Sequence, residues 1–127
     1  MPSYDDRLHD PPAPVALVVL RSSQGGAEVA DVSLLIDTGA DITLLPRLTV
    51  ERLGIEASAD EHRELIGFDG SRSLAPVVAM EMIFLGRIFR GRYLLIDGEQ
   101  GVLGRNILNH VSLLLDGPRG HWSESVP

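Results

Sequence analysis

Two short motifs hold the residues of this chain that are best suited to chemistry. Asp37-Thr38-Gly39 follows the apolar run Leu34-Leu35-Ile36, and Gly104-Arg105-Asn106 follows Val102-Leu103. A carboxylate placed at the end of a strand can take a proton from water as a general base. The chain has no cysteine, so acids and hydroxyls must carry any chemistry. The first motif alone is also compatible with a strand-ending turn, and the second motif makes the pattern more specific.

The elements that must position these motifs are mostly strands. Short apolar runs, several with a period of two, are separated by turns rich in Gly, Ser and Asp. The expected strands cover residues 15–20, 28–36, 61–67, 71–84, 88–96 and 111–115, with a further apolar stretch at 42–45. Pro46 and Gly54 bracket one short helix, and a second is expected over 106–110. About seven short strands indicate a mostly β barrel or sandwich.

The two motifs in their contexts resemble those of the retropepsin-like aspartic proteases, the single-domain family that includes the retroviral proteases. The resemblance covers most of residues 15–115 and rests on the pattern apolar-Asp-Thr-Gly-Ala and the later apolar-apolar-Gly-Arg-Asn. It implies a mostly β fold, a small closed β barrel of the acid-protease type with one or two short helices. It also implies a homodimer with one active site on the two-fold axis, an aspartic endopeptidase for peptide or protein substrates, with Asp37 as the catalytic residue.

The chemistry of peptide hydrolysis agrees with a homodimer in which Asp37 is the catalytic residue. Hydrolysis of a peptide without a metal or covalent intermediate needs one carboxylate to take a proton from water and a second group to protonate the carbonyl oxygen. Two close carboxylates can do both, because they cannot both ionise and so keep one proton between them. Other acids fit badly, since Asp69, Asp97 and Asp116 lie in turns or polar loops. An isologous two-fold contact would bring Asp37 against Asp37 of a second chain.

The neighbours of the catalytic residue are expected to support it. Gly39 lacks a Cβ, so the backbone can pass close to the carboxylates and offer its N–H. The resemblance implies that Thr38 crosses to the partner loop, that Asp41 accepts hydrogen bonds from the substrate main chain, and that Arg105 braces the loop. A planar guanidinium with five donors suits such bracing.

Ala40 allows a prediction about pH. Many two-lobed acid proteases have Ser or Thr at this place, whose hydroxyl donates to the catalytic carboxylate and favours its ionised form. Alanine lacks this donor, so the pair of carboxylates should keep its proton to higher pH than a serine version would. We expect activity at mildly acidic or near-neutral pH.

The tip of the hairpin formed by 61–67 and 71–84 is a turn with a glycine at each end. Its residues are Gly67, Phe68, Asp69 and Gly70. The resemblance makes this hairpin the flap that closes over substrate, and the four tip residues substrate-binding. Phe68 is also compatible with an ordinary aromatic residue on a hairpin.

Length and charge limit the remaining possibilities. The 127 residues allow one domain, which we expect at 15–120, between a flexible arm at 1–14 and a tail at 121–127. In the tail, Trp122 either anchors a partner chain or lies partly covered on the surface. The net charge of −7 argues against nucleic acid and anionic membranes as partners. The four histidines lack metal-ligand spacing, so we expect neither metal nor cofactor. No signal or membrane-spanning segment is evident, which predicts a cytoplasmic protein.

The sequence is also compatible with two other functions. A fold of this kind does not guarantee catalysis, so the chain could be a catalytically silent retropepsin-fold module that binds peptides or mediates dimerisation. It could also be the protease domain of a larger precursor, with the N-terminal arm as a linker.

Overall fold

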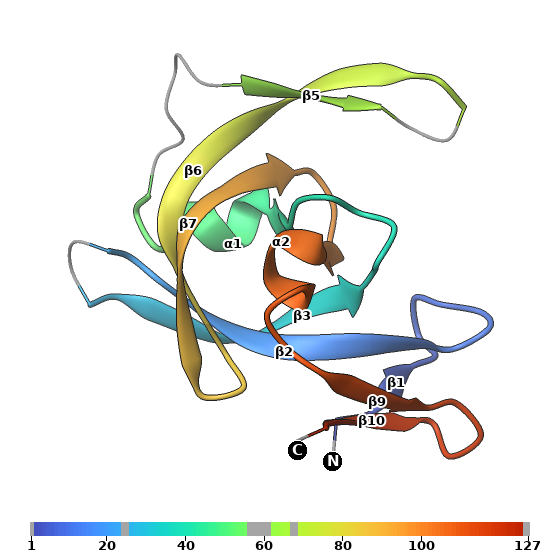
Figure 1. Ribbon diagram of the computed structural model, residues 1–127. Coiled ribbons are helices and arrows are strands. Elements are labelled where there is room, and N and C mark those ends of the chain that lie inside the picture. Colours follow the sequence, from blue (N-terminus) through green and yellow to red (C-terminus); the bar gives the residue numbers. More distant parts are fainter. Residues whose placement is uncertain (1, 24–25, 56–61, 67–68, 126–127) are drawn as a thin grey trace.

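The computed structural model describes residues 2–23, 26–55, 62–66 and 69–125 (Figure 1). Its strands are β1 (Tyr4–Asp5), β2 (Ala13–Arg21), β3 (Glu28–Ile36), β4 (Leu44–Pro46), β5 (His62–Ile66), β6 (Arg72–Phe84), β7 (Arg87–Ile96), β8 (Gly101–Leu103), β9 (Leu113–Asp116) and β10 (His121–Glu124). Its helices are α1 (Arg47–Glu51) and α2 (Arg105–Leu108). Neither of these described helices is long and apolar enough to cross a membrane.

Most of the strands form one sheet that closes on itself. The order is β1-β2-β3-β8-β4-β7-β6-β5, and β2 also pairs with β6. β2 pairs with β3 and, through Val19–Arg21, also with β6. The six strands β2, β3, β8, β4, β7 and β6 therefore form a ring. The mostly β, closed-barrel fold predicted from the sequence is therefore confirmed. The hairpin β5–β6 arches away from this ring at one end of the molecule (Figure 1).

Two parallel strands bring the two sequence motifs together. β3 pairs in parallel with β8, with Leu34 opposite Gly101 and Ile36 opposite Leu103. Since parallel strands end at the same edge of a sheet, the residues that follow them are neighbours. Asp37 and Gly104 therefore meet at this edge, although they lie far apart in the sequence.

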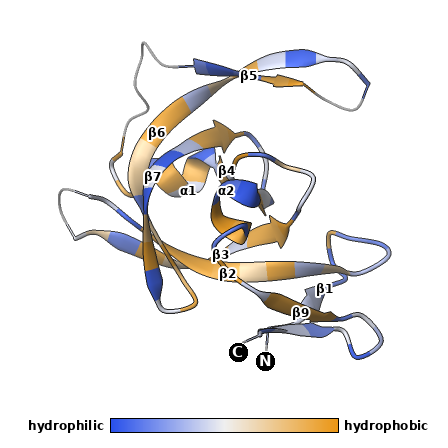
Figure 2. Ribbon diagram, in the orientation of Figure 1, coloured by the Kyte–Doolittle hydropathy of each residue, from blue (hydrophilic) through white to orange (hydrophobic). Residues whose placement is uncertain are grey.

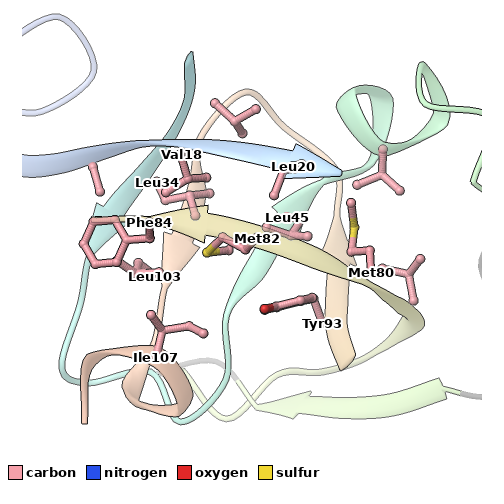
Figure 3. Packing of buried hydrophobic residues seen from close by; sticks show 14 of the residues in the cluster. Val18, Leu20, Leu34, Leu45, Met80, Met82, Phe84, Tyr93, Leu103 and Ile107 are labelled. Carbon is pink, nitrogen blue, oxygen red and sulfur yellow. The ribbon is translucent and has the colours of Figure 1, made fainter. Parts of the chain in front are cut away.

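Buried apolar side chains from alternate strand positions form the core inside the ring (Figure 3). Val18 and Leu20 of β2 and Met80 and Met82 of β6 point inward with a period of two, as expected for strands with one buried face. Figure 3 shows that side chains from several strands and from α2 converge. The core members labelled there are Val18, Leu20, Leu34, Leu45, Met80, Met82, Phe84, Tyr93, Leu103 and Ile107.

Both helices begin one residue away from their predicted start. α1 begins at Arg47, because Pro46 is still extended, with φ −61° and ψ 123°, and pairs with Ile96 of β7. α2 begins at Arg105, one residue before the predicted Asn106, and ends at Leu108.

The two ends of the chain differ from their predicted roles as a flexible arm (1–14) and a tail (121–127). Tyr4 of β1 pairs with Pro14, and its N–H donates to the carbonyl of Gly120 at 2.8 Å. Ser3 forms a bridge with His121 of β10. The described parts of both segments therefore belong to the folded unit, because each supplies hydrogen-bond partners for the other.

Trp122 anchors this junction. Its side chain is 2% exposed, its Nε1 donates to the carbonyl of Val15 at 2.8 Å, and its ring lies 6.0 Å from that of Phe84. Trp122 is thus a core residue of its own chain, neither an anchor for a partner nor a partly covered surface residue.

The last predicted strand, at 111–115, also differs. It was expected to be a core strand, whereas β9 pairs with β10 in a separate two-stranded sheet. Leu113 contacts the core, but Leu114 and Leu115 are 61% and 51% exposed.

Candidate active site

Asp37 begins the loop that follows β3. Its N–H donates to the carbonyl of Leu103 at 3.1 Å, which ties the start of the loop to the end of β8. Its carboxylate Oδ1 accepts the N–H of Gly39 at 2.8 Å. A Cβ on Gly39 would lie 3.0 Å from this oxygen, so glycine lets the backbone approach the carboxylate closely. The half-buried carboxylate is thus held by its own loop.

Arg105 fixes the outer part of the same loop. Its guanidinium Nη1 donates to the carbonyl of Thr38 at 2.7 Å, and its backbone N–H donates to the carbonyl of Ala40 at 2.8 Å. The side chain and the backbone N–H of Arg105 therefore hold the loop at two points, the carbonyls of Thr38 and Ala40. This arrangement corresponds to the bracing role that the sequence suggests for Arg105.

A buried hydroxyl, which neither sequence motif contains, connects the two motifs. Thr43 is fully buried, and its Oγ1 donates to Oδ1 of Asn106 at 2.7 Å and accepts the N–H of Gly104 at 3.0 Å. A polar residue in the apolar stretch 42–45 was the only signal in the sequence. Because buried polar groups require partners, this network fixes the loop against α2.

Gly104 permits the close approach of the two motifs. A Cβ at this position would lie 2.6 Å from the carbonyl carbon of Ile42 and 3.1 Å from the carbonyl oxygen of Ala40. No side chain fits there without movement of the backbone. The glycine of the second motif is therefore a packing requirement of the site.

The loop and the flap hairpin (β5 and β6) enclose a cleft of about 570 Å³. The carboxylate of Asp37 is among the groups that line it. Its apolar walls come from Ile42, Leu44, Leu65, Ile66 and Val102, and its other lining residues are Gly39, Ala40, Asp41, Arg63, Glu64, Ser71 and Ser73.

The cleft brings together part of the predicted site. Of the nine predicted positions besides Asp37, the lining includes Gly39, Ala40 and Asp41. Thr38 and Arg105 are not lining residues, and Arg105 holds the loop through the carbonyl of Thr38. Ser71, Ser73 and the strand residues from Arg63 to Ile66 were not predicted, because nothing in their local sequence shows which loop they face.

The predicted flap tip lies at the margin of this cleft. Gly67 and Phe68 fall outside the described residues. Asp69 and Gly70 are described and do not line the cleft. Asp69 Oδ1 accepts the N–H of Ser71 at 2.9 Å, and hydrogen bonds from the side chain and the backbone of Ser71 lower the pKa of Asp69. Gly70 has φ +83°, a conformation that glycine adopts without strain.

Comparison with known families agrees with this geometry. A model of aspartyl proteases matches residues 21–107, a span that contains both motifs and the flap hairpin. The chain belongs to the aspartyl protease family. The resemblance to retropepsin-like aspartic proteases, inferred from the sequence motifs, is thereby confirmed.

Solved structures of retroviral proteases share the fold of this chain. One of them is the EIAV protease in complex with the inhibitor HBY-793, with a TM-score of 0.61 and 23% sequence identity. The match covers 77% of this chain and 86% of that chain. In a search of curated protein sequences, none matches the chain significantly.

The titratable groups that line the cleft include three carboxylates. Within the described parts of the chain, no cluster of three or more His, Asp or Glu side chains could hold a metal ion. Three acids line the cleft, but Asp41 is paired with Arg63 and Glu64 with Arg72. Asp37 lines the same cleft, and its carboxylate accepts the N–H of Gly39.

Proposed function

We propose that this chain is an aspartic endopeptidase that acts as a homodimer, with the reacting water held between two copies of Asp37. The observation that carries the proposal is the position of Asp37: it lines a cleft, it lies on a braced loop, and among the described residues it is the one acid of the cleft without an arginine partner. One chain supplies one such group. Peptide hydrolysis by carboxylates needs two, so a second copy must supply the other.

The reaction uses the two carboxylates in opposite states. The ionised one takes a proton from water as the oxygen attacks the peptide carbonyl. The protonated one gives its proton to the carbonyl oxygen, which yields a tetrahedral diol. Collapse of the diol breaks the C–N bond, and the nitrogen leaves with a proton returned by the carboxylates. Like charges a few ångströms apart share one proton, so this mixed state persists over a wide range of pH.

The free edge of β9 supports the proposed second copy. Its partner on one side is β10, and its other edge faces no strand of the described chain. β10 itself is flanked on its second side by the N-terminal segment through Ser3 and Tyr4. An unpaired edge without Pro or Lys is a template for pairing with another chain. Antiparallel pairing of β9 with β9 of a partner is compatible with a two-fold axis.

Two exposed leucines make this edge suitable for burial. Leu114 and Leu115 project from β9, which is hydrophobic at the margin of the molecule (Figure 2). Burying a leucine side chain that was exposed contributes about 1.5 to 3 kcal/mol. Four such side chains in a two-fold contact would favour a stable dimer.

The cleft favours extended peptides with apolar side chains. Ile42, Leu44 and Val102 form an apolar wall next to the loop, and Leu65 approaches from the flap hairpin. Apolar walls with a few placed polar groups are typical of ligand sites. Asp41 offers carboxylate oxygens for main-chain N–H groups of such a peptide.

The test combines activity with association. We expect Asp37→Asn to abolish cleavage of unstructured peptides while the protein remains folded and dimeric in sedimentation. We expect Leu114→Glu to weaken the dimer at least tenfold, whereas Leu48→Glu, a matched change on the exposed face of α1, leaves it intact. Wild-type protein that binds peptides but never cleaves them would favour the silent module instead.

A further inference from the structure

An ion pair joins the flap hairpin to the loop at residues 37–43, which carries Asp37 and is here named the catalytic loop. Nη2 of Arg63, on β5, donates to Oδ2 of Asp41 at 2.9 Å. Both residues line the cleft that holds Asp37. The pair therefore spans the cleft from the strand above it to the loop below it.

The position of β5 gives this contact its importance. β5 is the last strand of the sheet, and β6 is its strand partner among the described residues. Arg63 lies opposite Ala75, which is 3% exposed, and Leu65, two residues on, lines the cleft. Alternation along a strand places Arg63 and Leu65 on the same face of β5, and both residues line the cleft.

The geometry leaves part of the Asp41 carboxylate available. Arg63 occupies Oδ2, and no described group donates to Oδ1. A carboxylate can accept several hydrogen bonds, and a charge-assisted partner on one oxygen fixes the direction of the other. Asp41 held in this way presents Oδ1 to a main-chain N–H in the cleft.

We propose that Arg63 is a positioning residue for substrate: its ion pair with Asp41 docks β5 on the catalytic loop and orients the carboxylate that receives the peptide main chain. The inference deepens the proposed function and rests on it for the identity of the ligand. The side chains of Arg63 and Asp41 are 50% and 62% exposed without substrate, so water and salt weaken the pair. A bound peptide displaces water from the cleft, which strengthens the pair and the hold on the peptide together.

The same hairpin provides a matched control. Arg72 of β6 pairs with Glu64 of β5 at 3.3 Å and is not a lining residue of the cleft. Removing this pair alters an exposed ion pair of the hairpin without touching the catalytic loop. Arg63→Gln removes the contact with Asp41 on the catalytic loop, whereas Arg72→Gln leaves that contact intact.

The kinetic test measures KM and kcat for one apolar peptide. We expect Arg63→Gln to raise KM about fivefold, the scale of one exposed ion pair, with kcat nearly unchanged. Arg63→Lys should restore part of the loss, and Arg72→Gln should match wild type. Asp41→Asn should raise KM, and the double variant with Arg63→Gln should be no worse than Asp41→Asn alone. Additive effects, or equal effects of Arg63→Gln and Arg72→Gln, would overturn the proposal.

A second measurement separates this inference from the proposed function. Amide hydrogen exchange over residues 62–66 needs no activity, and we expect it to be faster in Arg63→Gln than in wild type or Arg72→Gln. Unchanged exchange in Arg63→Gln would refute the docking even in an active enzyme. An inactive wild-type chain with the expected exchange would refute the endopeptidase, and with it the role in substrate binding, but support the docking.

Discussion

Arg105 donates a guanidinium N–H to the carbonyl of Thr38 across a separation of 67 positions in the chain, at 2.7 Å. The contact joins the start of α2 to the loop that carries Asp37. Because the backbone N–H of Arg105 also donates to Ala40, the loop is held at two points. The second motif thus fixes the conformation of the loop that the first motif forms.

Replacing this arginine should loosen the loop. Arg105→Lys keeps the charge but loses the planar fork, and we expect a decrease of about 1 kcal/mol in the free energy of unfolding together with reduced activity. Chemical denaturation measures the first quantity. Arg119→Lys, at an exposed pair with Asp116, is the control. Equal stability of the two variants would contradict the bracing role.

The close contact at Gly104 makes a stronger prediction. Gly104→Ala would place a Cβ 2.6 Å from backbone atoms of Ile42, and we expect it to cost about 3 kcal/mol or to prevent folding. Gly91→Ala, on β7, meets no atom within 4 Å and should be nearly neutral. Thermal unfolding of the two variants checks this, and similar melting temperatures would refute the packing argument.

Tyr93 predicts how stability changes at alkaline pH. Burial raises the pKa of Tyr93 to about 12, above its ordinary value of 10.0. The folded state thus favours the neutral phenol, whose contribution is complete below pH 10 and is lost as the pH rises towards 12. Its hydroxyl donates to the carbonyl of Phe89 at 2.7 Å. Tyr93→Phe should cost about 1 kcal/mol at neutral pH and lose less stability between pH 10 and 12. Parallel stability curves for the two proteins would contradict this assignment.

Ala40 lines the cleft one residue after Gly39 and carries no hydroxyl. Ala40→Ser would add a donor beside the two carboxylates of the proposed dimer and favour their ionised form. We therefore expect the pH optimum for peptide cleavage to move to lower pH. A pH–rate profile measures this, and an unchanged profile would count against the idea.

Local patterns in the sequence were sufficient for β3, the strand that leads to Asp37, but not for β8, which was not predicted as a strand. The bounds of β3 were predicted as Glu28–Ile36, as the structure has them, because its apolar residues alternate between clear turn signals. The pairing of the two motifs followed from a family resemblance and is explained by the parallel contact of β3 with β8.

Long-range pairing accounts for what the sequence did not reveal. The N-terminal segment contains prolines and acids with little to bury, and nothing local shows that Tyr4 will pair beside β10. The burial of Trp122 depends on Phe84 and Val15, which are distant in the sequence. The burial of Trp122 and the pairing of β10 together make the segment expected as a tail part of the fold.

The same reason applies to the site. Arg63 looks like one more charged residue on a strand, and its importance arises from the loop that β5 faces. Thr43 looks like an exception in an apolar stretch until Asn106 and Gly104 are seen beside it. Partners of polar side chains depend on the tertiary fold.

The central claim is that two chains share one active site through Asp37, and mixing of subunits tests it most directly. Wild-type protein is mixed with Asp37→Asn protein at constant total concentration, and cleavage of one peptide is measured after exchange. If each active site needs both carboxylates, activity follows the square of the wild-type fraction, about one quarter in an equal mixture. Activity proportional to the wild-type fraction, about one half, would show that one chain acts alone and would contradict the account.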